Sequence, residues 1–68
     1  MNFKEMSEFI QFRRKSLRVS QPELARLCGL SVHTISNVES GKGNPTLDVL
    51  LKITTVLGLD VRVDVPKP

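Results

Sequence analysis

The chain has 68 residues, of which 40% are hydrophobic and 25% are charged, and its formal net charge is +3. This length allows one small domain, spanning residues 1–68, and the composition is that of a globular and not of a disordered chain. The one cysteine cannot form an internal disulfide, and with the one histidine it cannot complete a zinc site. Because a core of this size is marginal by itself, we expect oligomerisation to add stability.

The chain lacks a long apolar run, and its longest is Val49–Leu51. We therefore expect no membrane-spanning segment and no association with a membrane. The N-terminal stretch is charged, so we also expect no secretory signal. An unpaired thiol without such a signal favours the cytoplasm.

The positive charge is concentrated in the first two thirds of the chain. Residues 1–44 carry seven basic and four acidic groups, whereas residues 45–68 carry three of each. Four basic residues lie close together, namely Arg13, Arg14, Lys15 and Arg18. This basic cluster indicates either a solvated helix face or the surface for an anionic partner such as nucleic acid, and charge alone leaves both open.

The first predicted helix covers residues 4–18. A second helix begins at a capping box formed by Ser20 and Glu23, tolerates a proline in its first turn, and ends at Gly29. Hydrophobic periodicity predicts the residues of these two helices that face the core: Met6, Ile10 and Leu17 with Phe9 beside them, then Leu24, Ala25 and Leu27.

A third helix is predicted after the cap Ser31, and a fourth after the cap Thr46. Residues 41–45 between them contain two glycines, an asparagine and a proline, which is typical of a loop. Gly58 ends the fourth helix. The expected inward residues are Ile35 and Val38 from the third helix and Leu47, Leu50, Leu51, Ile53, Val56 and Leu57 from the fourth.

After Gly58 the apolar residues recur every second position, which predicts a β-strand at residues 59–65. An unpaired strand is a template for association, so we expect it to pair across a homodimer. The predicted fold is therefore mainly α, with a four-helix core at residues 4–58 and this C-terminal strand. The expected interface residues are Leu59, Val61, Arg62, Val63 and Val65.

The stretch 21–39 has the features of two short helices that cross steeply on a tight turn. Ala25 allows the backbones to approach, and Gly29 accepts a positive φ without steric cost. Apolar residues on both sides can lock the crossing. This pattern predicts a helix-turn-helix, whose second helix projects into the DNA major groove.

The sequence resembles the lambda repressor/Cro-type helix-turn-helix proteins over roughly residues 9–58. The matching segments are Ser20-Gln21-x-Glu23-Leu24-Ala25, Gly29-Leu30-Ser31, Ile35-Ser36, Glu39-x-Gly41-Lys42 and Asn44-Pro45-Thr46-Leu47. Within that family, residues 9–17 and 57–63 resemble HipB-type antitoxins. The common repressor plan continues into a fifth helix, so the strand expected here suggests a shared sheet instead.

The resemblance implies which residues contact DNA. Base edges would meet the exposed face of the third helix, at Val32, His33, Ser36 and Asn37. The chemistry permits this, because Asn37 can pair with adenine through two hydrogen bonds and Val32 can touch a thymine methyl. The alternative is that these are ordinary exposed residues.

The family's phosphate contacts correspond to Gln21, Ser31, Thr34, Ser40 and Lys42. Gln21 lies in the first turn of the second helix, where backbone N–H groups favour an anion. For Ser31 helix capping is a competing role, compatible with phosphate contact. The family also implies a partly buried, structural ion pair between Arg14 and Glu39.

The predicted function is that of a sequence-specific DNA-binding repressor that binds double-stranded DNA, as a homodimer on an inverted-repeat operator, and so lies at the bacterial nucleoid. The HipB likeness implies an antitoxin role with a HipA-like kinase toxin as partner. The alternatives are a phage or restriction-system control repressor, or an antitoxin that acts purely by protein–protein interaction. Cys28 and His33 lack a third group and a pocket for nucleophilic catalysis, so we expect no enzyme activity, no cofactor and no metal.

Overall fold

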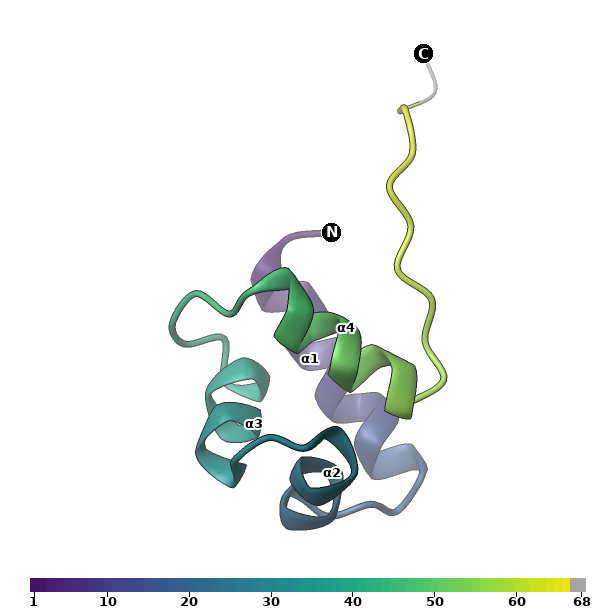
Figure 1. Cartoon of the computed structure of the whole chain (residues 1–68). Coiled ribbons are helices and arrows are strands. Elements are labelled where there is room, and N and C mark those ends of the chain that lie inside the picture. Colours follow the sequence, from purple (N-terminus) through teal and green to yellow (C-terminus); the bar gives the residue numbers. More distant parts are fainter. Residues whose placement is uncertain (67–68) are drawn as a thin grey trace.

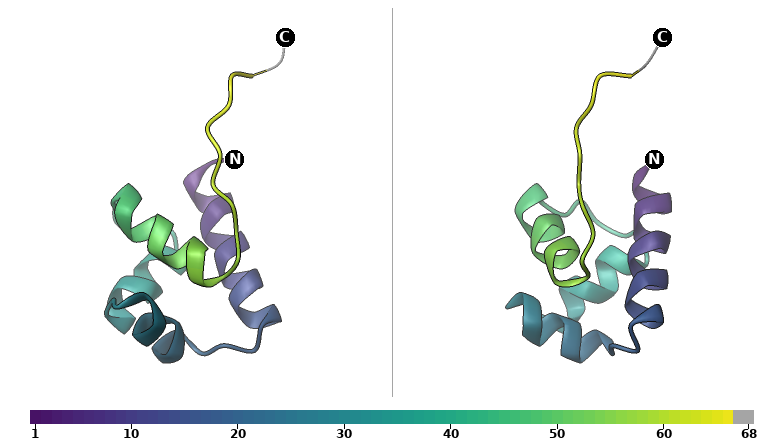
Figure 2. Two further views of the ribbon diagram at one scale, coloured as in Figure 1. Left: turned by 45° about the vertical axis from the view of Figure 1, so that its right-hand side comes forward. Right: turned by 90° about the vertical axis from the view of Figure 1, so that its right-hand side faces the viewer.

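The computed structural model describes residues 1–66, and this part of the chain contains four helices. They are α1 (Phe3–Ser16), α2 (Gln21–Cys28), α3 (Val32–Glu39) and α4 (Leu47–Val56). Helix α2 packs on α3 and α4, and α1 packs on α3, so that the helices surround one core (Figures 1 and 2). Residues 67–68 of the predicted domain lie outside the described residues. None of the described helices has the length and hydropathy needed to cross a membrane.

Each helix begins at a residue whose side chain accepts a hydrogen bond from the backbone N–H three positions later. The caps at Ser20, Ser31 and Thr46 make this bond at 3.1, 3.1 and 3.2 Å, as the sequence predicted. Helix α1 begins at Asn2, a cap that we did not predict, with an O···N distance of 2.8 Å. These bonds satisfy N–H groups that have no partner inside the helix.

Helix α1 ends at Ser16, so its predicted extension to residue 18 was wrong. Arg18 has φ of 58°, a left-handed conformation that cannot continue a right-handed helix. The backbone N–H groups of Arg18 and Val19 then donate to the carbonyls of Lys15 and Arg14 at 3.0 and 3.2 Å. The chain turns towards α2 at this point.

The core contains one buried group of apolar side chains, all of them from positions that the periodicity placed inside. They are Ile10, Leu24, Ala25, Ile35, Val38, Ile53 and Leu57. The periodicity was wrong for six further residues, which are exposed: Phe9, Leu17, Leu27, Leu47, Leu51 and Val56. Short helices that each pack on one or two neighbours bury only a narrow stripe, and residues at its edge or at a helix end stay in solvent.

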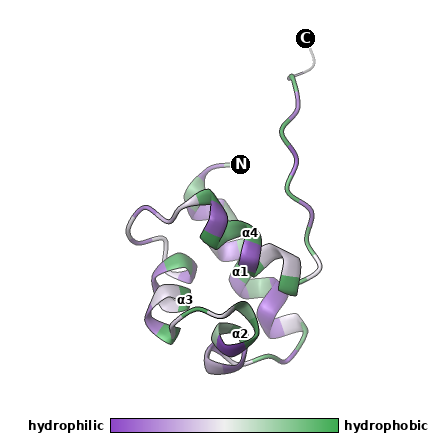
Figure 3. Cartoon of the chain, in the orientation of Figure 1, coloured by the Kyte–Doolittle hydropathy of each residue, from purple (hydrophilic) through white to green (hydrophobic). Residues whose placement is uncertain are grey.

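Residues 59–66 are extended and project away from the helices without forming a strand (Figures 1 and 2). The first residue of this segment is attached to α4, because the backbone N–H of Leu59 donates to the carbonyl of Thr54 at 2.8 Å. Apolar and polar residues alternate along the segment (Figure 3). Residues 60–66 are all exposed. The strand predicted at residues 59–65 is therefore not seen in the single chain, since a strand needs a hydrogen-bonded neighbour.

Truncating one core side chain should unfold the protein at lower denaturant. Ile53 is fully buried, so Ile53→Ala should lower the free energy of unfolding by about 2–5 kcal/mol in a urea titration. Leu47→Ala in the same helix is the matched control, because Leu47 is 64% exposed and should change stability by no more than about 0.5 kcal/mol. Equal losses for the two variants would contradict the observed core.

Candidate nucleic-acid interface

The outward face of α3 gathers four side chains on one surface. These are the residues predicted to contact bases, Val32, His33, Ser36 and Asn37, of which the first three are exposed and the last is partly buried. Their spacing places them on one side of a helix. Ile35, Val38 and Glu39 are buried on the opposite side, and their burial determines which side faces solvent.

The turn between α2 and α3 fixes how α3 is presented. Gly29 adopts φ of 69°, the left-handed conformation that allows the chain to leave α2 abruptly. The backbone N–H of Leu30 then donates to the carbonyl of Ala25 at 2.9 Å, and Ser31 caps the next helix. The predicted helix-turn-helix geometry is thus present at residues 21–39.

A buried ion pair holds the other end of α3. Nε of Arg14 donates to Oε2 of Glu39 at 2.6 Å, and its terminal Nη2 donates to Oε1 at 2.9 Å. The side chains are 9% and 1% exposed. Arg14 also donates to the carbonyl of Val19 at 2.7 Å, and Nε2 of Gln21 donates to Oε1 of Glu39 at 3.1 Å. Three helices therefore meet on one carboxylate.

Most of the residues predicted to contact phosphate have partners inside the protein. Gln21 binds Glu39, as described, and can still offer its second N–H to solvent. The hydroxyl of Ser31 caps α3 and lies 2.9 Å from Oγ1 of Thr34, while the hydroxyl of Ser40 donates to the carbonyl of Asn37 at 3.2 Å. Lys42 is the charged member of the set, and it is exposed in the loop between α3 and α4.

The basic cluster at residues 13–18 is partly structural. The guanidinium of Arg14 takes part in the buried ion pair with Glu39. Nε of Arg13 donates to the carbonyl of Leu57, at the C-terminal end of α4, at 2.9 Å. Lys15 and Arg18 are exposed. Sequence reasoning missed the role of Arg13, because no local pattern shows which residue will lie opposite the end of a distant helix.

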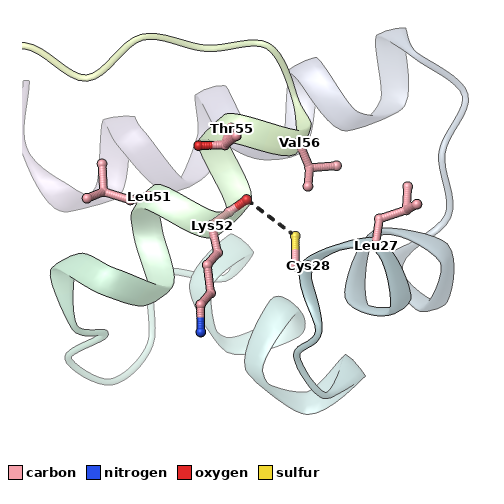
Figure 4. Close-up of a pocket in the computed structure, with 6 residues that line it drawn as sticks. All are labelled: Leu27, Cys28, Leu51, Lys52, Thr55 and Val56. Atoms are coloured by element: carbon pink, nitrogen blue, oxygen red, sulfur yellow. Dashed lines mark hydrogen bonds between the residues drawn. The ribbon is translucent and has the colours of Figure 1, made fainter.

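Cys28 lies partly buried in a shallow groove between α2 and α4 (Figure 4). Its thiol donates to the carbonyl of Lys52 at 3.7 Å, and burial raises the pKa of this thiol above its ordinary value. His33 instead lies 3.2 Å from Asn37, so the structure does not arrange Cys28 and His33 as a nucleophile and its base. Among residues 1–66 no three potential metal ligands lie close together.

The fold and the outward face of α3 define a helix-turn-helix protein. The profile of the helix-turn-helix family matches residues 10–63, and the chain belongs to this family, in its lambda repressor/Cro type. It is a family of DNA-binding transcriptional regulators.

Two relatives share parts of the sequence. The chain is 30% identical over 60 residues to the ImmF control region 10 kDa protein of Bacillus phage phi105, covering 88% of this chain and 67% of that protein. It is 40% identical over 50 residues to a helix-turn-helix-type transcriptional regulator of Haemophilus influenzae. That match covers 74% of this chain and 51% of the regulator, so the chain spans about half of its length.

Two solved structures have a similar fold. The restriction-modification controller protein C.AhdI from Aeromonas hydrophila has a TM-score of 0.79 and 29% identity, over 85% of this chain and 88% of its own. HipB in the HipA–HipB–O2–O3 complex has a TM-score of 0.87 and 28% identity, over 98% of this chain and 94% of its own.

Breaking the buried ion pair from one side should destabilise the protein strongly. Arg14→Met leaves the Glu39 carboxylate buried without its partner, so we expect a loss of about 3–5 kcal/mol in the free energy of unfolding. The double variant Arg14→Met/Glu39→Leu removes both charges and should recover most of that loss in the same urea titration. A double variant as unstable as the single one would show that the charges are not coupled.

Proposed function

We propose that the protein is a sequence-specific DNA-binding repressor that binds an inverted-repeat operator as a homodimer. The observation that carries this proposal is the outward face of α3, where an apolar and three polar side chains lie together on a helix fixed at both ends. Such a helix can enter the major groove and reach base edges. Two copies related by a two-fold axis would read half-sites whose centres lie ~34–36 Å or a multiple of that apart.

The C-terminal segment is the proposed dimer interface. Val61, Val63 and Val65 are exposed on an extended chain, and Leu59 and Val61 line a hollow together with Met6 and Phe9 of α1. Pairing of residues 59–65 with the same segment of a second copy would form the predicted strand and cover these apolar groups. An unpaired extended segment with apolar side chains favours this kind of association.

The antitoxin role is the regulatory context that we propose first. The support is the likeness to HipB, which extends over 98% of this chain, including most of the C-terminal segment. A HipA-like kinase toxin would then be a second partner. The likeness to C.AhdI and to a phage control-region protein supports the alternative, a restriction-system or phage control repressor. Either role is regulatory and not enzymatic, and it places the protein on DNA in the cytoplasm.

Two single substitutions should separate base contacts from phosphate contacts. Asn37→Ala should weaken binding to the operator by about 1–3 kcal/mol and relax the preference at one base pair of each half-site. Lys42→Ala should weaken binding to all sequences alike and, in a dimer, reduce the slope of log K against log[salt] by about 2. Gel shifts of a selected operator and of random duplexes in a salt series measure both effects. Binding that does not depend on salt would contradict the proposal and favour an antitoxin acting by protein–protein interaction.

A charge on the apolar side of the C-terminal segment should dissociate the dimer. Val63→Asp places a carboxylate in the proposed sheet face, so the protein should elute as a monomer in sizing chromatography at concentrations where the wild type is dimeric. Asp64→Ser is the matched control, because residue 64 points to the opposite face of an extended chain and should leave the dimer intact. A dimeric Val63→Asp variant would show that the interface lies elsewhere.

A further inference from the structure

A hydrogen bond joins two side chains on the outward face of α3. The amide nitrogen of Asn37 lies 3.2 Å from Nε2 of His33, one helical turn earlier. An amide nitrogen donates and does not accept, so Nε2 of His33 is the acceptor in this arrangement. The ring proton of a neutral His33 is then on Nδ1.

The backbone of Asn37 is held in place. Its backbone carbonyl accepts hydrogen bonds from the backbone N–H of Lys42 at 2.9 Å and from the hydroxyl of Ser40 at 3.2 Å. The residue is partly buried where α3 meets the following loop. These bonds fix the backbone from which the side chain departs, and the bond to His33 then distinguishes the two orientations of the amide that a half-turn exchanges.

That half-turn decides which base the amide can read. Adenine offers a donor at N6 and an acceptor at N7, and an asparagine pairs with both through its oxygen and one N–H. The second N–H is not used by the base, and it is the group that can donate to His33. After a half-turn the amide would present its nitrogen to the N6 amino group, where two donors meet, and its oxygen to N7, where two acceptors meet. On guanine the turned amide could still donate to O6, so the half-turn lowers the preference for adenine over guanine.

We propose that His33 is a positioning residue that sets the base specificity of Asn37. By accepting from the amide nitrogen, His33 selects the orientation in which Asn37 reads adenine in preference to guanine. This inference rests on the proposed DNA-binding function, and it adds that the two side chains read one base pair as a unit.

The test compares hydrogen-bond acceptors and donors at position 33. Duplexes are first selected from a randomised pool with the wild-type protein, and the base pair at which Asn37→Ala relaxes the preference identifies the position read by Asn37. Dissociation constants are then measured for two duplexes that differ only there, with adenine or guanine. Their ratio cancels the effect of a charge change on overall affinity, because both duplexes carry the same phosphates.

His33→Glu offers only acceptors, so it should retain the wild-type preference for adenine. His33→Lys offers only donors, so it should turn the amide and lower the preference by about 5- to 150-fold, the range of one lost bidentate contact. In the Asn37→Ala background neither substitution should change the ratio. Because His33 is exposed, both variants should fold like the wild type, and thermal unfolding checks this.

The possible failures are distinguishable. If the wild-type protein enriches no duplex, the proposed DNA-binding function is wrong, and this inference falls with it. If the protein binds a selected duplex but His33→Lys keeps the adenine preference, or His33→Glu loses it equally, His33 does not orient Asn37. A change of ratio that persists without the Asn37 side chain would also overturn the inference.

Discussion

The bidentate pair between Arg14 and Glu39 is the interaction on which the rest of the structure depends. It joins the end of α1 to the end of α3, and Gln21 adds the start of α2 to the same carboxylate. A glutamate near a helix C-terminus and close to a proposed phosphate surface is electrostatically unfavourable by itself. The guanidinium neutralises it, and the charge is sealed from solvent, so that α3 can face an anionic partner without repelling it.

The local features of the fold could be predicted from the sequence, because each depends on residues a few positions apart. The caps at Ser20, Ser31 and Thr46 and the turn at Gly29 are of this kind. Two other features could not be predicted in this way. The end of α1 depends on where the chain must turn, and the exposure of Leu27 depends on how much of α2 the neighbouring helices cover. Periodicity identifies a helix face, but it does not tell how wide a stripe of that face is buried.

The candidate site likewise has features that local spacing predicts and contacts that it does not. The four side chains on the outward face of α3 could be placed from the sequence, because helical spacing and the inward positions of Ile35 and Val38 determine that face. The contacts Gln21–Glu39 and Arg13–Leu57 join residues 18 and 44 positions apart, and no spacing rule reaches that far. The bond between His33 and Asn37 spans only one helical turn, yet it depends on rotamers and on a tautomer that the sequence does not specify.

Two adjacent arginines connect the proposed dimer interface to the proposed DNA-reading helix. Arg14 holds the end of α3, and Arg13 holds the carbonyl of Leu57, from which the extended segment departs two residues later. The end of α3 and the end of α4 are therefore both bonded to the same turn of α1. Because reading an inverted repeat requires two copies of α3 at a fixed separation, the proposed dimer would need a firm connection between residues 59–65 and α3. The turn of α1 that carries both arginines would supply that connection, and it gives a reason why Arg13 and Arg14 bind groups inside the protein, Arg14 buried and Arg13 partly buried, instead of being offered to DNA.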